Sequence, residues 1–264
     1  MYNFVMKLLF SFILISLCLL IWSMFIEPNI LIVKHLIIHD EQLKGLKIVF
    51  ASDFHVKPHE TYRLNKIVRT INEQNPDIVL FGGDYVNGHK KGNSLSIEKI
   101  AKKFSYIVSK YGTYVVIGNH DGWQGKEEII EALKKNGINV LFNNNACLKD
   151  FCIAGVDDLQ TGNPDIEKAL SGVNKPVILL THTPDIMPNV PYNVNLTLAG
   201  HLHGGQVRLN KALIVPSIYG DKYANGFLND NGKKIYTTRG LGTSILPIRF
   251  NCPPEIVVIE FPLH

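Results

Sequence analysis

Six short apolar runs, rich in β-branched residues, each lead into a carboxylate or imidazole side chain. Near-continuous hydrophobic runs of this length are typical of strands that are buried on both faces of a sheet. In open α/β sheets, ligands bind at the carboxyl ends of the strands. The pattern therefore predicts a buried sheet system with an Asp- and His-rich site along one edge. The runs are LKIVFASD, DIVLFGGD, TYVVIGNH, FCIAGVDD, PVILLTH and VNLTLAGH, and the polar residues at their ends are Asp53, Asp84, His120, Asp157, His182 and His201.

Segments with the apolar periodicity of helices lie between the early runs. Apolar side chains recur at helical spacing in residues 62–74, 95–110 and 126–137. The final third lacks such segments, and QVRL, KKIYTTRG and EIVVIEF resemble antiparallel strands. We predict one α/β domain over residues 40–264, with two packed sheets flanked by helices.

The amino-terminal segment has a different character. Residues 8–26 contain no charged side chain, and their length matches the ~20 residues that cross a bilayer. Because no A-x-A-like cleavage site follows, we expect residues 1–30 to form an uncleaved signal anchor. Lys7 flanks one end and Lys34 and Lys44 the other, so the positive-inside rule does not decide which side of the membrane holds the domain.

Charge and cysteine content narrow the classes of function. The formal net charge of +4 suits a membrane surface or an anionic substrate and gives no basis for nucleic-acid binding. Cys18 lies in the apolar segment, and Cys147, Cys152 and Cys252 form no C-x-x-C pair. We therefore expect neither a disulfide framework nor a thiolate zinc site, and we expect inert, buried thiols.

Five polar clusters follow the predicted strands: ASDFH (51–55), FGGDYVNG (81–88), IGNHD (117–121), LLTHTPD (179–185) and AGHLHGG (199–205). Each cluster alone is compatible with turn chemistry or a core histidine. Their repetition at strand ends, always with nitrogen or oxygen ligands, indicates a metal site for Zn, Fe, Mn, Co or Ni. Seven ligands exceed the needs of one ion and fit two ions that share a carboxylate, the arrangement used for in-line displacement at phosphorus. These ligands are Asp53, His55, Asp84, Asn119, His182, His201 and His203.

The histidine pair in AGHLHGG has a predicted division of labour. On a strand, residues two apart point to the same side about 6.6–6.8 Å from one another. That separation suits one imidazole for each of two neighbouring ions. We expect His201 and His203 to serve different ions and Leu202 to face the core.

The motifs D-x-H, GD, GNHD, an isolated His and GHxH occur in this order over residues 53–203 and together resemble the calcineurin-like metallophosphoesterases. The tail TTRGLGTSILPIRFNCPPEIVVIEF (237–261) is similar to that of the membrane-associated bacterial YaeI/YkuE-like phosphodiesterases. That subgroup is related to the lipid A enzyme that hydrolyses UDP-2,3-diacylglucosamine. The resemblance implies a four-layer α-β-β-α sandwich of two mixed sheets.

The resemblance also implies a role for each site residue. It assigns Asn119 and His120 to substrate contact, with His120 as the catalytic residue that assists the leaving oxygen. GDYVNG departs from the GDYVDRG of phosphoprotein phosphatases, with Asn87 for the acid and Gly88 for the arginine, which disfavours protein phosphatase activity. Asp121 has two possible roles: it orients His120 in place of the missing acid, or it is a turn residue. The implied metal ligands are Asp53, His55 and His203 for one ion, Asn119, His182 and His201 for the other, and Asp84 as the bridge.

These observations favour a membrane-anchored enzyme that uses two divalent ions, with Mn expected and Zn, Fe or Co accepted, to hydrolyse phosphodiester or pyrophosphate bonds. A metal-activated hydroxide is the expected nucleophile. A lipid-linked substrate such as UDP-2,3-diacylglucosamine, at the inner membrane of the cell, is the leading expectation. The alternatives are a general phosphodiesterase with soluble substrates and a non-catalytic metal-binding scaffold.

Overall fold

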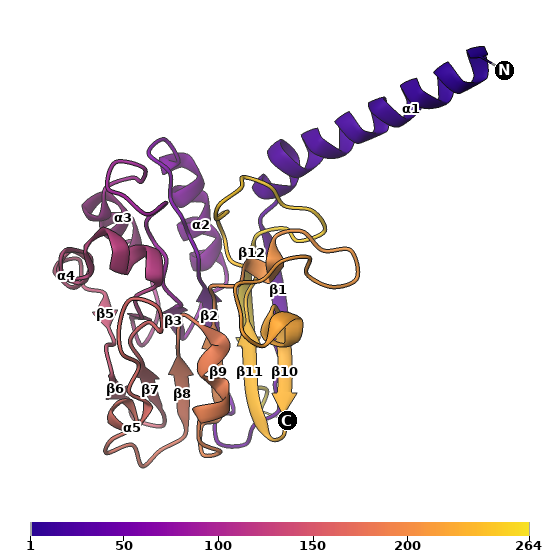
Figure 1. The fold of residues 1–264 in the computed structure, drawn as a ribbon. Helices are drawn as coiled ribbons and strands as arrows, with labels where there is room; N and C mark the ends of the chain where they lie inside the picture. Colours follow the sequence, from indigo (N-terminus) through magenta and orange to yellow (C-terminus); the bar gives the residue numbers. More distant parts are fainter. Residues whose placement is uncertain (1, 264) are drawn as a thin grey trace.

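Two six-stranded mixed sheets pack face to face in the computed structural model, which describes residues 2–263 (Figure 1). The first sheet has the order β1 (Ile32–Ile37), β12 (Glu255–Glu260), β2 (Lys47–Ala51), β3 (Ile78–Phe81), β4 (Thr113–Val115) and β5 (Asn139–Val140). The second has the order β10 (Gly226–Asp230), β11 (Lys233–Thr237), β9 (Leu196–Ala199), β8 (Val177–Leu180), β7 (Cys152–Gly155) and β6 (Asn144–Cys147).

The sheets are buried on both faces, which explains the uninterrupted apolar runs. In β2, Ile48 and Phe50 pack between the two sheets, whereas Val49 and Ala51 pack under the helices of the outer layer. The outer face of the second sheet is covered by the short helix α5 (Ile166–Ala169) and the 3-10 turn η3 (Pro184–Asn189). The predicted four-layer sandwich is therefore confirmed, with one thin helical layer.

Three amphipathic helices cover the first sheet: α2 (Thr61–Glu73), α3 (Ile97–Phe104) and α4 (Asn119–Lys135). All three were predicted, but α4 begins seven residues before the predicted segment 126–137, with a kink at Gly125 (φ 125°). The early start matters because it places the GNHD motif on the first turn of α4. The prediction failed there because glycine and asparagine at 118 and 119 resemble turn residues.

Helix α1 (Tyr2–Ile21) projects away from the domain (Figure 1). The helical stretch Phe4–Asn29 has a mean hydropathy of 2.7 and is long and apolar enough to cross a membrane. Its end is attached to the carboxyl-terminal segment: the Arg249 amide donates to the Ser23 carbonyl at 2.9 Å, and the Cys252 amide donates to the buried Glu27 carboxylate. The helix therefore leaves the domain from a fixed position.

The expectations for the last third are confirmed only in part: KKIYTTRG and EIVVIEF contain strands β11 and β12, as predicted. QVRL is not a strand: only isolated bridges form there, between Val207 and Phe250 and between Arg208 and Ala212. Strand β11 is antiparallel to β10 but parallel to β9, and β12 is antiparallel to β2 but parallel to β1.

The AGHLHGG segment also differs from its predicted geometry. Strand β9 ends at Ala199, and His201 and His203 have left-handed φ angles of 70° and 51°. The two histidines therefore lie on a turn, not on one face of a strand. Leu202 is buried, as predicted.

The cysteine prediction is wrong for two of the four residues. Cys147 and Cys152 form a disulfide, because they lie directly opposite one another in the β6–β7 hairpin. The missed signal is their separation by four residues around Lys149–Asp150, a spacing that suits a hairpin. Cys252 is a buried free thiol, as expected, and Cys18 is an exposed one.

Candidate metal centre

The predicted ligands come together from both sheets at the carboxyl ends of their strands. Each of these side chains is less than a tenth exposed, so the whole group is buried. Asp53 and His55 follow β2, Asp84 follows β3, Asn119 opens α4 after β4, His182 follows β8, and His201 and His203 follow β9. Asp157, at the end of β7, lies outside this group and forms an ion pair with Lys126 at 2.8 Å.

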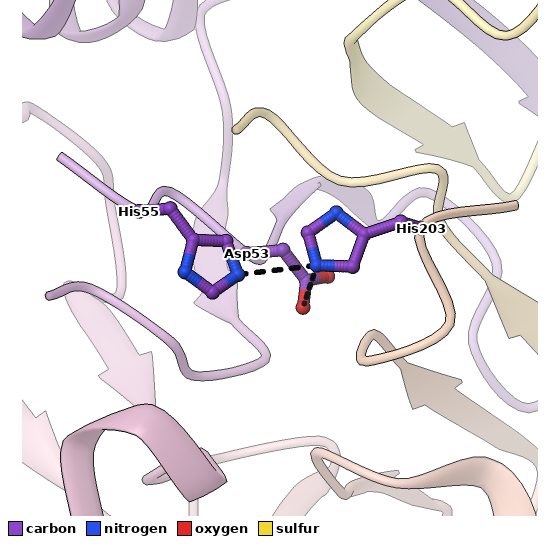
Figure 2. A group of neighbouring side chains, drawn as sticks. All are labelled: Asp53, His55 and His203. Carbon is purple, nitrogen blue, oxygen red and sulfur yellow. Dashed lines mark hydrogen bonds and ion pairs between the residues drawn. The ribbon is translucent and has the colours of Figure 1, made fainter. Parts of the chain in front are cut away.

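Asp53, His55 and His203 form the first group of side chains (Figure 2). The Nε2 atoms of His55 and His203 are 3.1 Å apart, and His203 Nε2 is 3.6 Å from Asp53 Oδ1. The Asp53 carboxylate also accepts the backbone N–H of His201 at 2.9 Å, which ties the β2 and β9 loops together.

Asn119, His182 and His201 form the second group. His182 Nε2 lies 2.8 Å from Asn119 Oδ1 and 3.2 Å from His201 Nδ1. The other ring nitrogen of His182 donates to the Gly82 carbonyl at 2.7 Å. A backbone carbonyl on the far nitrogen fixes the tautomer and orientation of a metal-binding imidazole. The Gln160 amide nitrogen Nε2 lies 3.1 Å from Nε2 of His201 and donates to it, so this side chain also holds its ring in place.

Asp84 lies between the two groups. Its Oδ2 atom is 3.3 Å from His182 Nε2 and 3.5 Å from His55 Nε2, and its Oδ1 accepts the backbone N–H of His120 at 2.8 Å. Ligand atoms that each sit ~2.1 Å from one ion are about 3.0–3.4 Å from one another in octahedral or tetrahedral coordination. The spacing of the donor atoms in both groups therefore fits divalent cations.

The electrostatics of the centre also fit cations. Burial raises the pKa of Asp53 to about 7 and lowers the pKa of His55 to about 3 and of His201 to about 4. Burial opposes ionisation of Asp84, but the adjacent His182 outweighs it and holds the carboxyl pKa below its ordinary value. Burial opposes the protonation of His182 as well, but the adjacent Asp84 outweighs it and raises the pKa of His182 to about 10. The centre therefore combines buried carboxylates, which need compensating positive charge, with neutral imidazoles at His55 and His201 and a protonated one at His182.

Asp121 shapes the loop that carries Asp84. Its carboxylate accepts the backbone N–H groups of Asp84 at 2.8 Å, Tyr85 at 2.9 Å, Val86 at 3.2 Å and Gly118 at 3.0 Å. Of the two roles considered for Asp121, the structure supports the turn and cap role and not the orientation of His120.

A backbone carbonyl orients His120 instead. His120 Nδ1 lies 3.0 Å from the Gly88 carbonyl, which also accepts from Gln124 Nε2 at 2.7 Å. His120 Nε2 is thereby turned toward the centre, 3.5 Å from Ser244 Oγ. Asn87 takes no part, because its amide donates to the Asn93 carbonyl. Gln124 was not predicted as part of the site, although it lies one helical turn after His120 on the same face of α4.

Arg249 supports the centre from the carboxyl-terminal loop through bonds to backbone carbonyls. It is fully buried, and its guanidinium donates to the carbonyls of Cys252 at 2.8 Å and Arg239 at 2.9 Å, and to those of Gly240 and Gly242. Cys252 Sγ in turn donates to the His203 carbonyl at 3.3 Å. Arg249 therefore folds the carboxyl-terminal loop against the turn that holds His203.

Comparison with known proteins agrees with this geometry. The calcineurin-like phosphoesterase family matches residues 46–205. The chain is 35% identical to the uncharacterised metallophosphoesterase YkuE of Bacillus subtilis, over 81% of this chain and 78% of that protein. It is also 35% identical to phosphodiesterase YaeI of Escherichia coli, over 81% of each chain. A transmembrane protein with a metallophosphoesterase domain from Danio rerio is 30% identical, over 83% of this chain and 54% of that protein.

The order of the motifs, the two sheets that bring them together and the extent of these matches lead to one assignment. The chain belongs to the calcineurin-like phosphoesterase family and is a metal-dependent phosphoester hydrolase.

Proposed function

We propose that this protein is a membrane-anchored hydrolase that cleaves phosphodiester or pyrophosphate bonds of a lipid-linked substrate with two divalent ions. The observation that carries the two-ion proposal is the position of Asp84 Oδ2, 3.3 Å from His182 of one group and 3.5 Å from His55 of the other. One carboxylate oxygen within reach of both groups suits a shared ligand.

The proposed ligands of the first ion are Asp53, His55 and His203, those of the second are Asn119, His182 and His201, and Asp84 is common to both. When bound, such a pair of ions lowers the pKa of water and neutralises charge on phosphoryl oxygens. Manganese is the expected metal and the first to test. The donor set of nitrogen and oxygen atoms accepts manganese, and it also accepts zinc, iron and cobalt.

His120 is the proposed catalytic proton donor. The Gly88 carbonyl holds its Nδ1, so Nε2 is the atom that can deliver a proton to the leaving oxygen. Asn119, the preceding residue, is proposed to contact the same phosphoryl group. The chain has no acid at Asn87 to raise the basicity of His120, which favours a substrate with a good leaving group, such as a pyrophosphate.

The apolar stretch Phe4–Asn29 supports a membrane anchor over residues 1–30. The catalytic domain, predicted over residues 40–264, also includes β1 (Ile32–Ile37), which pairs with β12. A tether concentrates an enzyme where a lipid-linked substrate resides. UDP-2,3-diacylglucosamine is therefore the first substrate to test, and the inner membrane is the proposed location.

The test is hydrolysis by the purified full chain with added Mn²⁺, against a panel of lipid diphosphates, nucleotide diphosphates and a chromogenic phosphodiester. Cleavage of lipid diphosphates supports the proposal. Cleavage of the soluble diester alone favours a general phosphodiesterase. A protein that retains two ions yet cleaves nothing in the panel is a non-catalytic scaffold, and the proposal is then wrong.

A further inference from the structure

We propose that two loops beside the metal centre insert apolar side chains into the bilayer surface, so that the active site opens at the level of the lipid headgroups. This inference rests on the proposed membrane anchoring by α1. We name these side chains the apolar rim; they are Leu209, Leu213, Ile214 and Ile218 between β9 and β10, and Ile245 and Leu246 between β11 and β12.

The side chains of the apolar rim are largely exposed to solvent, and the conformation of their loops does not explain why they are apolar. Ile214 and Ile218 are each 83% exposed and Ile245 is 96% exposed. Ile245 also has a φ of 62°, a conformation in which glycine or asparagine is usual and a β-branched residue is an outlier. Neither packing nor turn chemistry explains isoleucine there. Grouped apolar side chains on a surface mark contact with a partner or a membrane.

The rim lies where α1 would leave a bilayer. As a helix, the charge-free residues 8–26 span about 30 Å, close to the thickness of the hydrocarbon layer. Trp22 lies one turn before the end of this stretch and so near the interface, a position that tryptophan favours. The Arg249 amide donates to the Ser23 carbonyl at this level, and Ile245 lies only four residues before Arg249. In Figure 1 the loop between β11 and β12 lies at the base of α1.

The two rim loops are held together. The Gln206 carboxamide accepts from the Ser244 amide at 2.8 Å and donates to the Ser244 carbonyl at 2.9 Å. The Phe250 amide donates to the Gln206 carbonyl at 2.9 Å. The loops therefore form one surface in place of two independent flaps. Lys211, exposed in the same surface, suits anionic lipid headgroups.

A cavity of about 470 Å³ connects the rim with the metal centre. Leu213, Ile214 and Ile245 line its outer part, and Asn119 and His120 line its inner part. An apolar wall that leads from the bilayer surface to His120 would let a lipid substrate reach the centre without crossing water. The bilayer is favoured over a protein partner because the same surface adjoins the exit of an exposed apolar helix.

The test places a polarity-sensitive nitrobenzoxadiazole label on the full chain in vesicles of phosphatidylethanolamine and phosphatidylglycerol. In a Cys18→Ser background, the variants Ile218→Cys and Ile245→Cys carry the label, since Cys252 is buried and Cys147 and Cys152 are bonded. The matched control is Val108→Cys. Val108 is 72% exposed and lies at the opposite edge of the sheets, where its amide donates to Asn72 at the end of α2.

Quenching by nitroxide-bearing lipids at residues 218 and 245, with none at residue 108, is the expected result. Equal access of aqueous iodide to all three labels would overturn the proposal. So would labels shielded from iodide but not reached by the lipid quencher, because the rim would then contact a second copy or another protein. Hydrolysis of the soluble diester by the unlabelled chain is measured in parallel, so that a failure of the proposed catalysis is distinguished from a failure of the rim.

Discussion

Gly118 is the position where a single methyl group should test the geometry around Asp84. A Cβ atom at Gly118 would lie 2.6 Å from the Asp84 amide nitrogen and 2.8 Å from its carboxyl carbon. The φ of Gly118 is −100°, which alanine adopts readily, so Gly118→Ala acts through steric contact and not through backbone strain.

The added methyl must displace the Asp84 loop. Overpacking of a tight site costs about 1–3 kcal/mol of folding stability. The Asp84 carboxylate stands 3.3 Å and 3.5 Å from imidazole nitrogens of the two groups, so a shift of a few tenths of an ångström disturbs both. Loss of the interactions that orient metal ligands typically lowers metal affinity 10–100-fold. We expect a loss of this size for both ions in Gly118→Ala.

The assay is calorimetric titration of the metal-free full chain with Mn²⁺, together with thermal unfolding without metal. Gly137→Ala is the control, because Gly137 has a φ of 78° with open space around it. That substitution costs about 1–2 kcal/mol through the left-handed backbone conformation and should leave metal affinity unchanged. Wild-type affinity in Gly118→Ala would refute the account of the Asp84 loop.

Three further predictions concern single groups. His120→Ala should abolish turnover while both ions remain, as measured by steady-state hydrolysis and metal analysis; activity at wild-type level would remove His120 from the mechanism. Because burial raises the pKa of Asp53 from 3.8 to about 7, the metal-free fold loses stability as the pH rises from about 4 to 7, and the full cost is present above pH 7. Metal-free Asp53→Asn should therefore be more stable than wild type at pH 8. This advantage should shrink toward pH 5, as Asp53 of the folded wild type becomes protonated. A difference in the free energy of unfolding by denaturant that stays the same from pH 8 to pH 5 would contradict this. Thiol titration of the unfolded, unreduced chain should find two thiols and not four, since Cys147 is bonded to Cys152.

The central layers of the fold could be predicted from the sequence because strands buried on both faces leave an unambiguous apolar pattern. The run KIVFA of β2 supplies both cores, and such a run has no other common explanation in an α/β chain. The order of strands in each sheet could not be predicted. Strand β12 pairs with both β1 and β2, and nothing in EIVVIEF distinguishes a parallel partner from an antiparallel one.

The site was more accessible to prediction than the backbone that carries it. The ligands are aspartate, asparagine and histidine residues that follow predicted strands, and the carboxyl ends of the strands meet at one edge of the sheets. The turn at His201–His203 was missed because left-handed conformations of histidine have no marker in the sequence. The orientation of His120 was missed because a backbone carbonyl, that of Gly88, replaces the acidic side chain that a motif comparison looks for.

Metal stoichiometry of the wild-type chain and of Asp84→Ala tests the central claim most directly. Elemental analysis after loading with Mn²⁺ and removal of the excess should find two ions per wild-type chain. The Asp84→Ala variant should hold neither ion, because the carboxylate between the two groups is gone. A wild-type chain that holds a single ion, or an Asp84→Ala variant that retains two, would contradict the shared-ligand centre.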